Sequence, residues 1–188
     1  MWYRQHLFAL LSVWVFLVSA CLLGMPGYGQ SAQKLPYNVA QTNQAWDGVN
    51  NHDWKGAVQH ADLVINHFSK LADGLHDMLA AKIKRHEAET PPTGVPTPKQ
   101  KAATFKYGLM NDVATCYYIK AKSLFALYLQ RKREHADESE LASLRKDLKN
   151  AYDSCLKYPL ARCWDPQGWF WSPAIAVRED VDLKKVGL

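Results

Sequence analysis

Apolar side chains recur along the chain at the spacing of a helix. The clearest stretch places them at steps of three and one, on one continuous helical face: Trp54, Ala57, Val58, Ala61, Val64, Ile65 and Phe68. Asp53 directly precedes this stretch and is a favourable N-cap residue. The spacing continues beyond residue 68, and it leaves open whether residues 54–86 form one helix or two.

Three further stretches show the same periodicity. Residues 39–48 favour a helix that packs through Trp46, and residues 99–130 and 141–156 favour two longer helices. We find no pattern typical of paired strands or of a hairpin. The sequence therefore predicts an all-α fold, a compact bundle of antiparallel helical hairpins.

A proline-rich segment interrupts this pattern. Residues 90–98 contain four prolines and one glycine, and a segment of this composition cannot be helical. We expect an extended, exposed linker inside the domain. A docking peptide for an aromatic groove is the alternative interpretation.

The C-terminal region, residues 163–188, begins with an aromatic segment. Asp165-Pro-Gln-Gly is typical of a type I turn, and Ser172 and Pro173 suit the start of a final capping helix. The turn brings four aromatic residues together: Trp164, Trp169, Phe170 and Trp171. They either cap the open end of the helical pair or form a platform for sugar rings or partner side chains, with Asp165 as a hydrogen-bonding group.

Residues 1–30 have the features of an export leader and not of a folded segment. Arg4 is followed by residues 7–25, which contain no charged side chain. The tetrapeptide that ends at Cys21 resembles a bacterial lipobox, in which this cysteine is lipidated. Conventional cleavage and retention as a transmembrane anchor are the alternatives. Each outcome predicts export from the cytoplasm. Lipidation or a retained leader would attach the protein to the membrane at the cell envelope or periplasm, whereas conventional cleavage would give a secreted protein.

Length and charge limit the number of domains and the classes of partner. The chain has 188 residues and a formal net charge of +5, which allows one domain, residues 31–188, after the leader. Acidic residues are interspersed with the basic ones, which argues against a nucleic-acid partner and permits contact with an anionic surface.

Three cysteines follow the leader: Cys116, Cys155 and Cys163. In an oxidising compartment a disulfide could join Cys155 to either of the other two. Three buried thiols are the alternative. No C-x-x-C motif is present, so zinc binding and thioredoxin-like chemistry have no support.

The sequence contains no motif for catalysis, for a cofactor or for a metal. G-x-S-x-G, a P-loop and H-E-x-x-H are all missing from the chain. His60 and His67 lie two helical turns apart, too far for one metal ion. We therefore expect a protein that is not an enzyme.

Residues 40–68 resemble a tetratricopeptide repeat. His52-Asp53-Trp54 stands where that family has its Gly-Asp-Tyr turn, and Ala45 matches the small residue of the first helix.

Residues 109–159 resemble a second repeat, with Tyr117 and Ala121 in its first helix and Pro159 as the closing proline. The turn of this second repeat is longer than the family's. Residues 163–171 and 110–117 are also similar to a group of exported bacterial repeat proteins. The resemblance implies a protein-interaction module without catalytic residues, whose groove or packing residues include the following: Trp46, Trp54, Tyr117 and Tyr118.

The sequence thus predicts a non-enzymatic interaction module of the cell envelope that binds a peptide or partner helix in a helical groove. A carbohydrate-binding accessory protein that uses residues 164–171 is the alternative, and a small glycan-active enzyme is a third hypothesis. Sugar stacking predicts that Trp169 or Trp171 is exposed, whereas capping predicts that both are buried. An enzyme predicts two carboxylates that converge in a cleft.

Overall fold

The computed structural model describes residues 35–188, and the predicted leader with Cys21 lies outside this part of the chain. Residues 35–188 form one compact unit whose helices share a hydrophobic core. In chain order its elements are α1 (Tyr37–Asn50), α2 (Trp54–Lys84), α3 (Pro98–Phe105), α4 (Gly108–Arg133), α5 (Glu138–Leu156), β1 (Cys163–Asp165), β2 (Trp169–Trp171), α6 (Pro173–Asp180) and a 3-10 helix η1 (Leu183–Val186). The predicted all-α class is confirmed.

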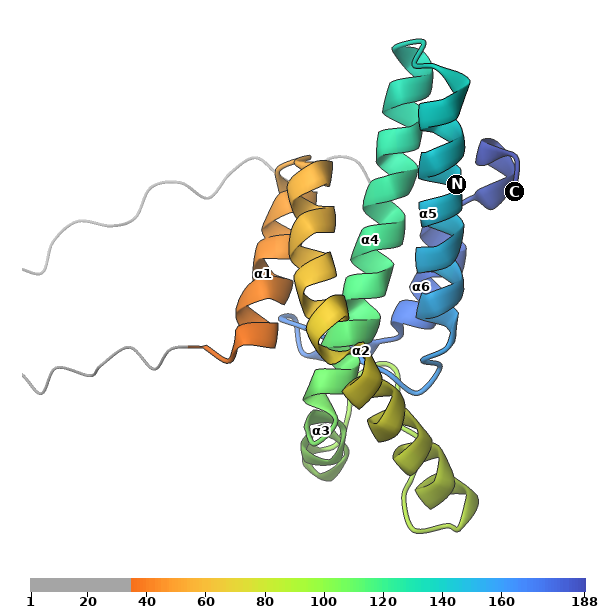
Figure 1. The fold of residues 1–188 in the computed structure, drawn as a ribbon. Coiled ribbons are helices and arrows are strands. Elements are labelled where there is room, and N and C mark those ends of the chain that lie inside the picture. The colour runs from red at the N-terminus through yellow and green to blue at the C-terminus, as the bar shows by residue number, and fades with distance from the viewer. Residues whose placement is uncertain (1–34) are drawn as a thin grey trace, which may run out of the picture. The chain divides into compact units, whose positions relative to one another are not determined.

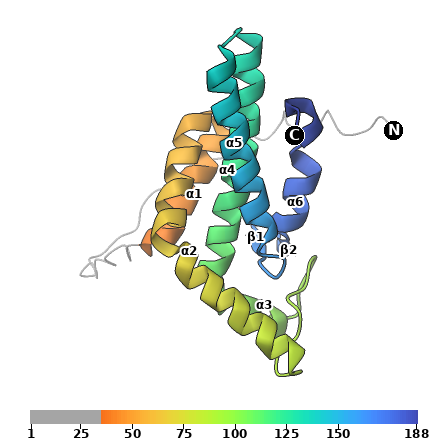
Figure 2. The same cartoon turned by 45° about the vertical axis from the view of Figure 1, so that its right-hand side comes forward.

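The helices pack as two antiparallel hairpins. α2 and α4 share the most extensive contact, α1 packs on α2, and α5 packs on α4 (Figure 1). α6 lies against α4 and α5 on the other side of the bundle (Figure 2). The arrangement leaves the C-terminal half of α2, together with α3, extending from one end of the bundle.

Small residues let α1 and α2 approach closely. Ala45, Gly48, Ala57 and Ala61 are all buried at this crossing. A Cβ atom on Gly48 would come within 2.7 Å of the backbone nitrogen of Ala57 and 2.9 Å of its Cβ. The connection between the two helices ends at Asp53, whose carboxylate accepts a hydrogen bond from the Gly56 amide at 3.0 Å, as expected for an N-cap.

The two longest periodic stretches of the sequence differ in whether each forms a single helix. α2 is one continuous helix of 31 residues, which settles the alternative left open by the sequence. The stretch 99–130 is instead two helices, because the chain turns at Lys106 and Tyr107. The amide of Asn111 stabilises this turn by donating to the Thr104 carbonyl at 3.2 Å.

The sequence predicted no paired strands, and this prediction was wrong. β1 and β2 pair antiparallel, with Trp164 opposite Phe170, and the Gly168 amide closes the connecting turn on the Asp165 carbonyl at 2.9 Å. The turn itself lies where the sequence predicts it. Each strand has only three residues, which is too short for an alternating pattern to be recognised.

The proline-rich segment is not a simple exposed linker. Gly94 and Phe170 exchange two backbone hydrogen bonds, of 2.7 and 2.9 Å, so residues 90–97 form a strap along β2. Pro91 is buried, whereas Val95 is 84% exposed. The strap ends at Thr97, which caps α3 in a reciprocal capping box with Gln100.

None of the helices in the described residues is both long enough and apolar enough to span a membrane.

Candidate ligand-binding cleft

A cleft of about 1120 Å³ opens where α1, the first half of α4, the β1–β2 hairpin and α6 meet. We call it the aromatic cleft. Six of its lining residues are Trp or Phe: Trp46, Phe105, Trp164, Trp169, Phe170 and Trp171. The aromatic hairpin and two of the predicted groove residues, Trp46 and Tyr118, therefore line the same cleft.

Two aromatic clusters support the walls of the cleft. Trp171 of β2 packs edge-on against Trp46 of α1 and Tyr118 of α4, with ring centroids 6.1 and 5.2 Å apart. Trp164 packs edge-on against Phe170 at 4.9 Å, and the ammonium group of Lys101 lies 3.8 Å from the centre of the Trp164 ring. Such contacts fix the ring positions before any ligand arrives.

Exposure differs sharply among the hairpin aromatics. Phe170 is 1% exposed and belongs to the core, and Trp164 and Trp171 are half-buried. Trp169 is 37% exposed at the rim of the cleft. Capping of the bundle accounts for Phe170 and Trp171. It does not account for Trp169, because capping predicts that this ring is buried.

The polar side of the cleft contains three carboxyl groups, those of Asp112, Asp165 and Glu179. Asp112 accepts a hydrogen bond of 2.6 Å from the Asn38 amide, yet burial raises the pKa of this carboxyl to about 6. Asp165 accepts from the Gln167 backbone amide at 2.8 Å inside the turn. The hydroxyl and amide side chains that complete this side are Thr42, Asn43, Asn50, Thr93, Asn111, Thr115 and Ser172.

Arg162 joins the segments around the cleft. Its guanidinium donates to four backbone carbonyls, those of Pro91, Pro92, Pro159 and Ala161, at 2.7 to 3.1 Å. Its backbone amide donates to the side-chain oxygen of Asn111 at 2.9 Å. Burial lowers the pKa of this arginine. Arg162 therefore ties the strap to the hairpin and α4, and thereby shapes the cleft.

The predicted groove residues fall into two groups. Trp46 and Tyr118 line the aromatic cleft, whereas Trp54 and Tyr117 do not. Tyr117 stacks on Tyr158 with centroids 6.0 Å apart, and Trp54 packs edge-on against His52. Trp54 and Tyr117 thus support packing at other faces of the bundle.

The three cysteines of the described chain are free thiols, which is the alternative that the sequence left beside a disulfide. Cys116 contacts the Thr42 hydroxyl at 3.4 Å, Cys155 donates to the Ala114 carbonyl, and Cys163 lines the cleft. Burial raises the pKa of each thiol to about 12. Each is therefore protonated near neutral pH and is a poor nucleophile.

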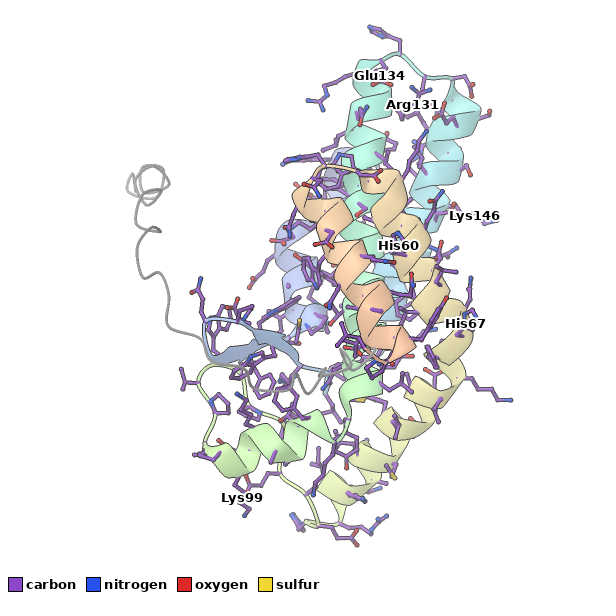
Figure 3. The ribbon with its side chains drawn as sticks, turned by 90° about the vertical axis from the view of Figure 1, so that its left-hand side faces the viewer. His60, His67, Lys99, Arg131, Glu134 and Lys146 are labelled. Atoms are coloured by element: carbon purple, nitrogen blue, oxygen red, sulfur yellow. The ribbon has the colours of Figure 1, made fainter. Side chains whose placement is uncertain are left out.

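The histidines have separate structural surroundings. Figure 3 shows His60 and His67 on α2, where they contact the Gln41 side chain at 2.8 Å and the Leu63 carbonyl at 2.7 Å. His52, His86 and His135 take left-handed backbone angles immediately after α1, α2 and α4, where each ends a helix. Within residues 35–188, no group of three His, Cys, Asp or Glu side chains is arranged to hold a metal ion.

Sequence reasoning missed two residues that define the cleft, Asp112 and Arg162. Both sit beside predicted aromatic or helical features, but nothing in the local pattern separates them from ordinary charged residues. Comparison of the chain with protein-family models, with curated proteins and with solved structures gave no match in any of the three.

Proposed function

We propose that this protein binds a glycan chain in the aromatic cleft without acting on it chemically. The observation that carries the proposal is the exposed ring of Trp169 at the rim of a cleft of about 1120 Å³ that is otherwise lined by aromatic and hydrogen-bonding side chains. Flat aromatic faces and polar groups together match a sugar ring, whose faces carry C–H groups and whose edge carries hydroxyls.

The composition of the lining favours a glycan over a partner helix. A docked amphipathic helix buries Leu and Ile side chains, which pack against aliphatic side chains of the groove. Among the described lining residues, Ile175 is the one branched aliphatic side chain. The remaining apolar surface is mainly aromatic, and this favours stacking over the burial of aliphatic side chains.

In this proposal the two sides of the cleft make different contacts with the ligand. Trp169 stacks against a sugar ring, and the carboxyl groups of Asp112 and Asp165 accept hydrogen bonds from its hydroxyls. The two aromatic clusters hold the walls in place, so that little conformational entropy is lost on binding.

The first experiment titrates the fragment 34–188 with neutral and acidic oligosaccharides and follows tryptophan fluorescence. We expect saturable binding of at least one glycan. Replacing Trp169→Ala should weaken it by about 1–3 kcal/mol, because a stacking face is lost. Tyr37→Ala is the matched control, since Tyr37 is 45% exposed on α1 and does not line the cleft.

Three results would contradict this proposal. The proposal would be wrong if no glycan shifts the fluorescence. It would also be wrong if both variants bind as the unmodified fragment does, because Trp169 would then not contact the ligand. If reducing ends accumulate during the titration, the cleft acts on its ligand and the non-enzymatic assignment is wrong.

A peptide is the second candidate ligand, and the position of the cleft favours it. The cleft is lined by residues of α1 and α4, the first helices of the two segments that resemble tetratricopeptide repeats, a resemblance that implies a protein-interaction module. A peptide captured from an envelope extract, and lost with the same Trp169→Ala variant, would support this candidate over the glycan.

We further propose that the protein acts at the cell envelope or periplasm, held there by its leader or by a lipid on Cys21. Metabolic labelling with a fatty acid, compared between the natural chain and Cys21→Ser, tests the lipid attachment.

A further inference from the structure

The net positive charge of the described chain is concentrated at one end of the molecule. Residues 79–107, which we call the basic lobe, contain six Lys and Arg and two Glu, a net charge of +4. The rest of residues 35–188 has fifteen basic and sixteen acidic side chains, a net charge of −1. The mildly basic character of the domain is therefore a property of this lobe.

The basic lobe is also set apart in space. It consists of the last residues of α2, the strap and α3, and it lies at the end of the molecule opposite the α4–α5 turn (Figure 2). Figure 3 shows Lys99 at this end, far from Arg131 and Glu134 at the other. A surface that meets this end would not contact the α4–α5 turn.

A pocket of about 570 Å³ lies within the basic lobe, between the end of α2, the strap and α3. Three lysines line it: Lys82, Lys99 and Lys106. Its two acidic residues are already engaged, because Glu87 binds Arg85 through two hydrogen bonds and Glu89 lies 3.9 Å from Lys99. With Lys99 beside Glu89, the pocket retains the positive charges of Lys82 and Lys106 for an anionic group.

One large apolar side chain projects from the same lobe. Val95 at the tip of the strap is 84% exposed, the largest exposure among the large hydrophobic residues of the described chain. Phe105 at the end of α3 is 48% exposed, but its ring packs against Trp164 and Phe170 and belongs to the aromatic cleft. An exposed apolar side chain in a segment rich in lysines is typical of segments that enter the interface of a lipid bilayer.

We propose that the basic lobe docks on the anionic surface of a phospholipid bilayer. Its pocket takes a phosphate-bearing lipid headgroup, and Val95 at the tip of the strap enters the interface. The headgroup pocket and the aromatic cleft share no lining residue, so this contact does not depend on the glycan proposal. It would orient the domain on the membrane in addition to any attachment through the leader.

The test uses the fragment 34–188, so that the leader cannot contribute, and vesicles of phosphatidylcholine alone or mixed with phosphatidylglycerol. We expect binding to the anionic vesicles only, weakening as salt is added. The combined change Lys82→Gln, Lys99→Gln and Lys106→Gln should lower the partition coefficient about tenfold or more, because each lysine near the surface adds attraction.

A matched control removes the same charge elsewhere, at exposed lysines on α2, α5 and its C-terminal end: Lys70→Gln, Lys146→Gln and Lys157→Gln. It should leave binding within about twofold of the unmodified fragment, since these residues lie outside the lobe. Val95→Asn should weaken binding to vesicles but keep its salt dependence, because it removes only the apolar contact.

Equal binding to both kinds of vesicle would overturn the proposal, as would equal losses in the two lysine variants. Binding to heparin as tight as to vesicles, with no effect of Val95→Asn, would also overturn it, in favour of a soluble polyanion as the partner.

Discussion

Asp112 is a carboxyl group whose burial works against the stability of the fold. Its pKa is raised to about 6 in the folded chain, while an unfolded aspartate ionises near pH 4. Between these values the folded chain holds a proton that the unfolded chain has released. The free energy of unfolding therefore falls as the pH rises from about 4 to about 6, and stays lower above that range.

Replacing Asp112→Asn should consequently stabilise the protein above pH 6. We expect a gain on the order of 1–3 kcal/mol near pH 8 and almost none near pH 4, because the amide has no charge to bury and can still accept from Asn38. Urea denaturation at both pH values measures this difference. The same variant should bind glycan more weakly, and a variant that gained stability with unchanged binding would remove Asp112 from the site.

Individual site residues were predictable where their type is rare or their setting is distinctive. The tryptophans of the hairpin stood out because four aromatics surround a turn-forming tetrapeptide. Asp112 and Arg162 did not, since their importance comes from burial and from partners 51 to 74 positions away in the sequence, such as Asn38 and Asn111. No local pattern encodes such contacts.

At the scale of elements, the α1–α2 crossing depends on a residue without a side chain. Gly48→Ala would place a methyl group against the backbone of Ala57, and helix backbones cannot yield locally. We expect a loss of about 1–3 kcal/mol, despite the better helix propensity of alanine.

Gly74 of α2 provides the control for this prediction, because a Cβ atom there meets nothing within 4 Å. Gly74→Ala should stabilise the protein by about 0.5–1 kcal/mol. Thermal unfolding of the two single variants tests this prediction. Equal shifts of the melting temperature in the same direction would show that the crossing is not tightly packed.

Helices were the elements that the sequence predicted best, because a periodic apolar face extends over many turns. The break between α3 and α4 was missed, since apolar spacing continues across Lys106 and Tyr107 while the backbone turns. The hairpin and strap were missed for a different reason. Their pairing rests on backbone hydrogen bonds between Gly94 and Phe170, which leave no trace in side-chain pattern.

At the scale of the whole molecule, Arg162 joins the strap to the connection between α5 and β1. Replacing Arg162→Gln would leave backbone carbonyls of the strap and of this connection without a donor in a buried place. We expect a loss of about 2–4 kcal/mol. Hydrogen exchange should show the amides of Gly94 and Phe170 opening before those of the helices.

The control for this change is Arg131→Gln at the α4–α5 turn, where the arginine pairs with Glu134 and Glu140 at the surface (Figure 3). This variant should lose less than about 1 kcal/mol, as is usual for exposed ion pairs. Uniform exchange throughout the Arg162→Gln protein would mean that the strap and hairpin unfold together with the bundle.

The unbroken course of α2 has a consequence for how the chain can change in length. At about 1.5 Å per residue, its 31 residues form a rod of about 46 Å that runs from the α1 crossing into the basic lobe. One residue inserted near its middle would turn the two ends by about 100° relative to each other and swing the lobe away from the bundle. Natural variants of this chain should therefore gain or lose residues at the α4–α5 turn and keep α2 constant in length.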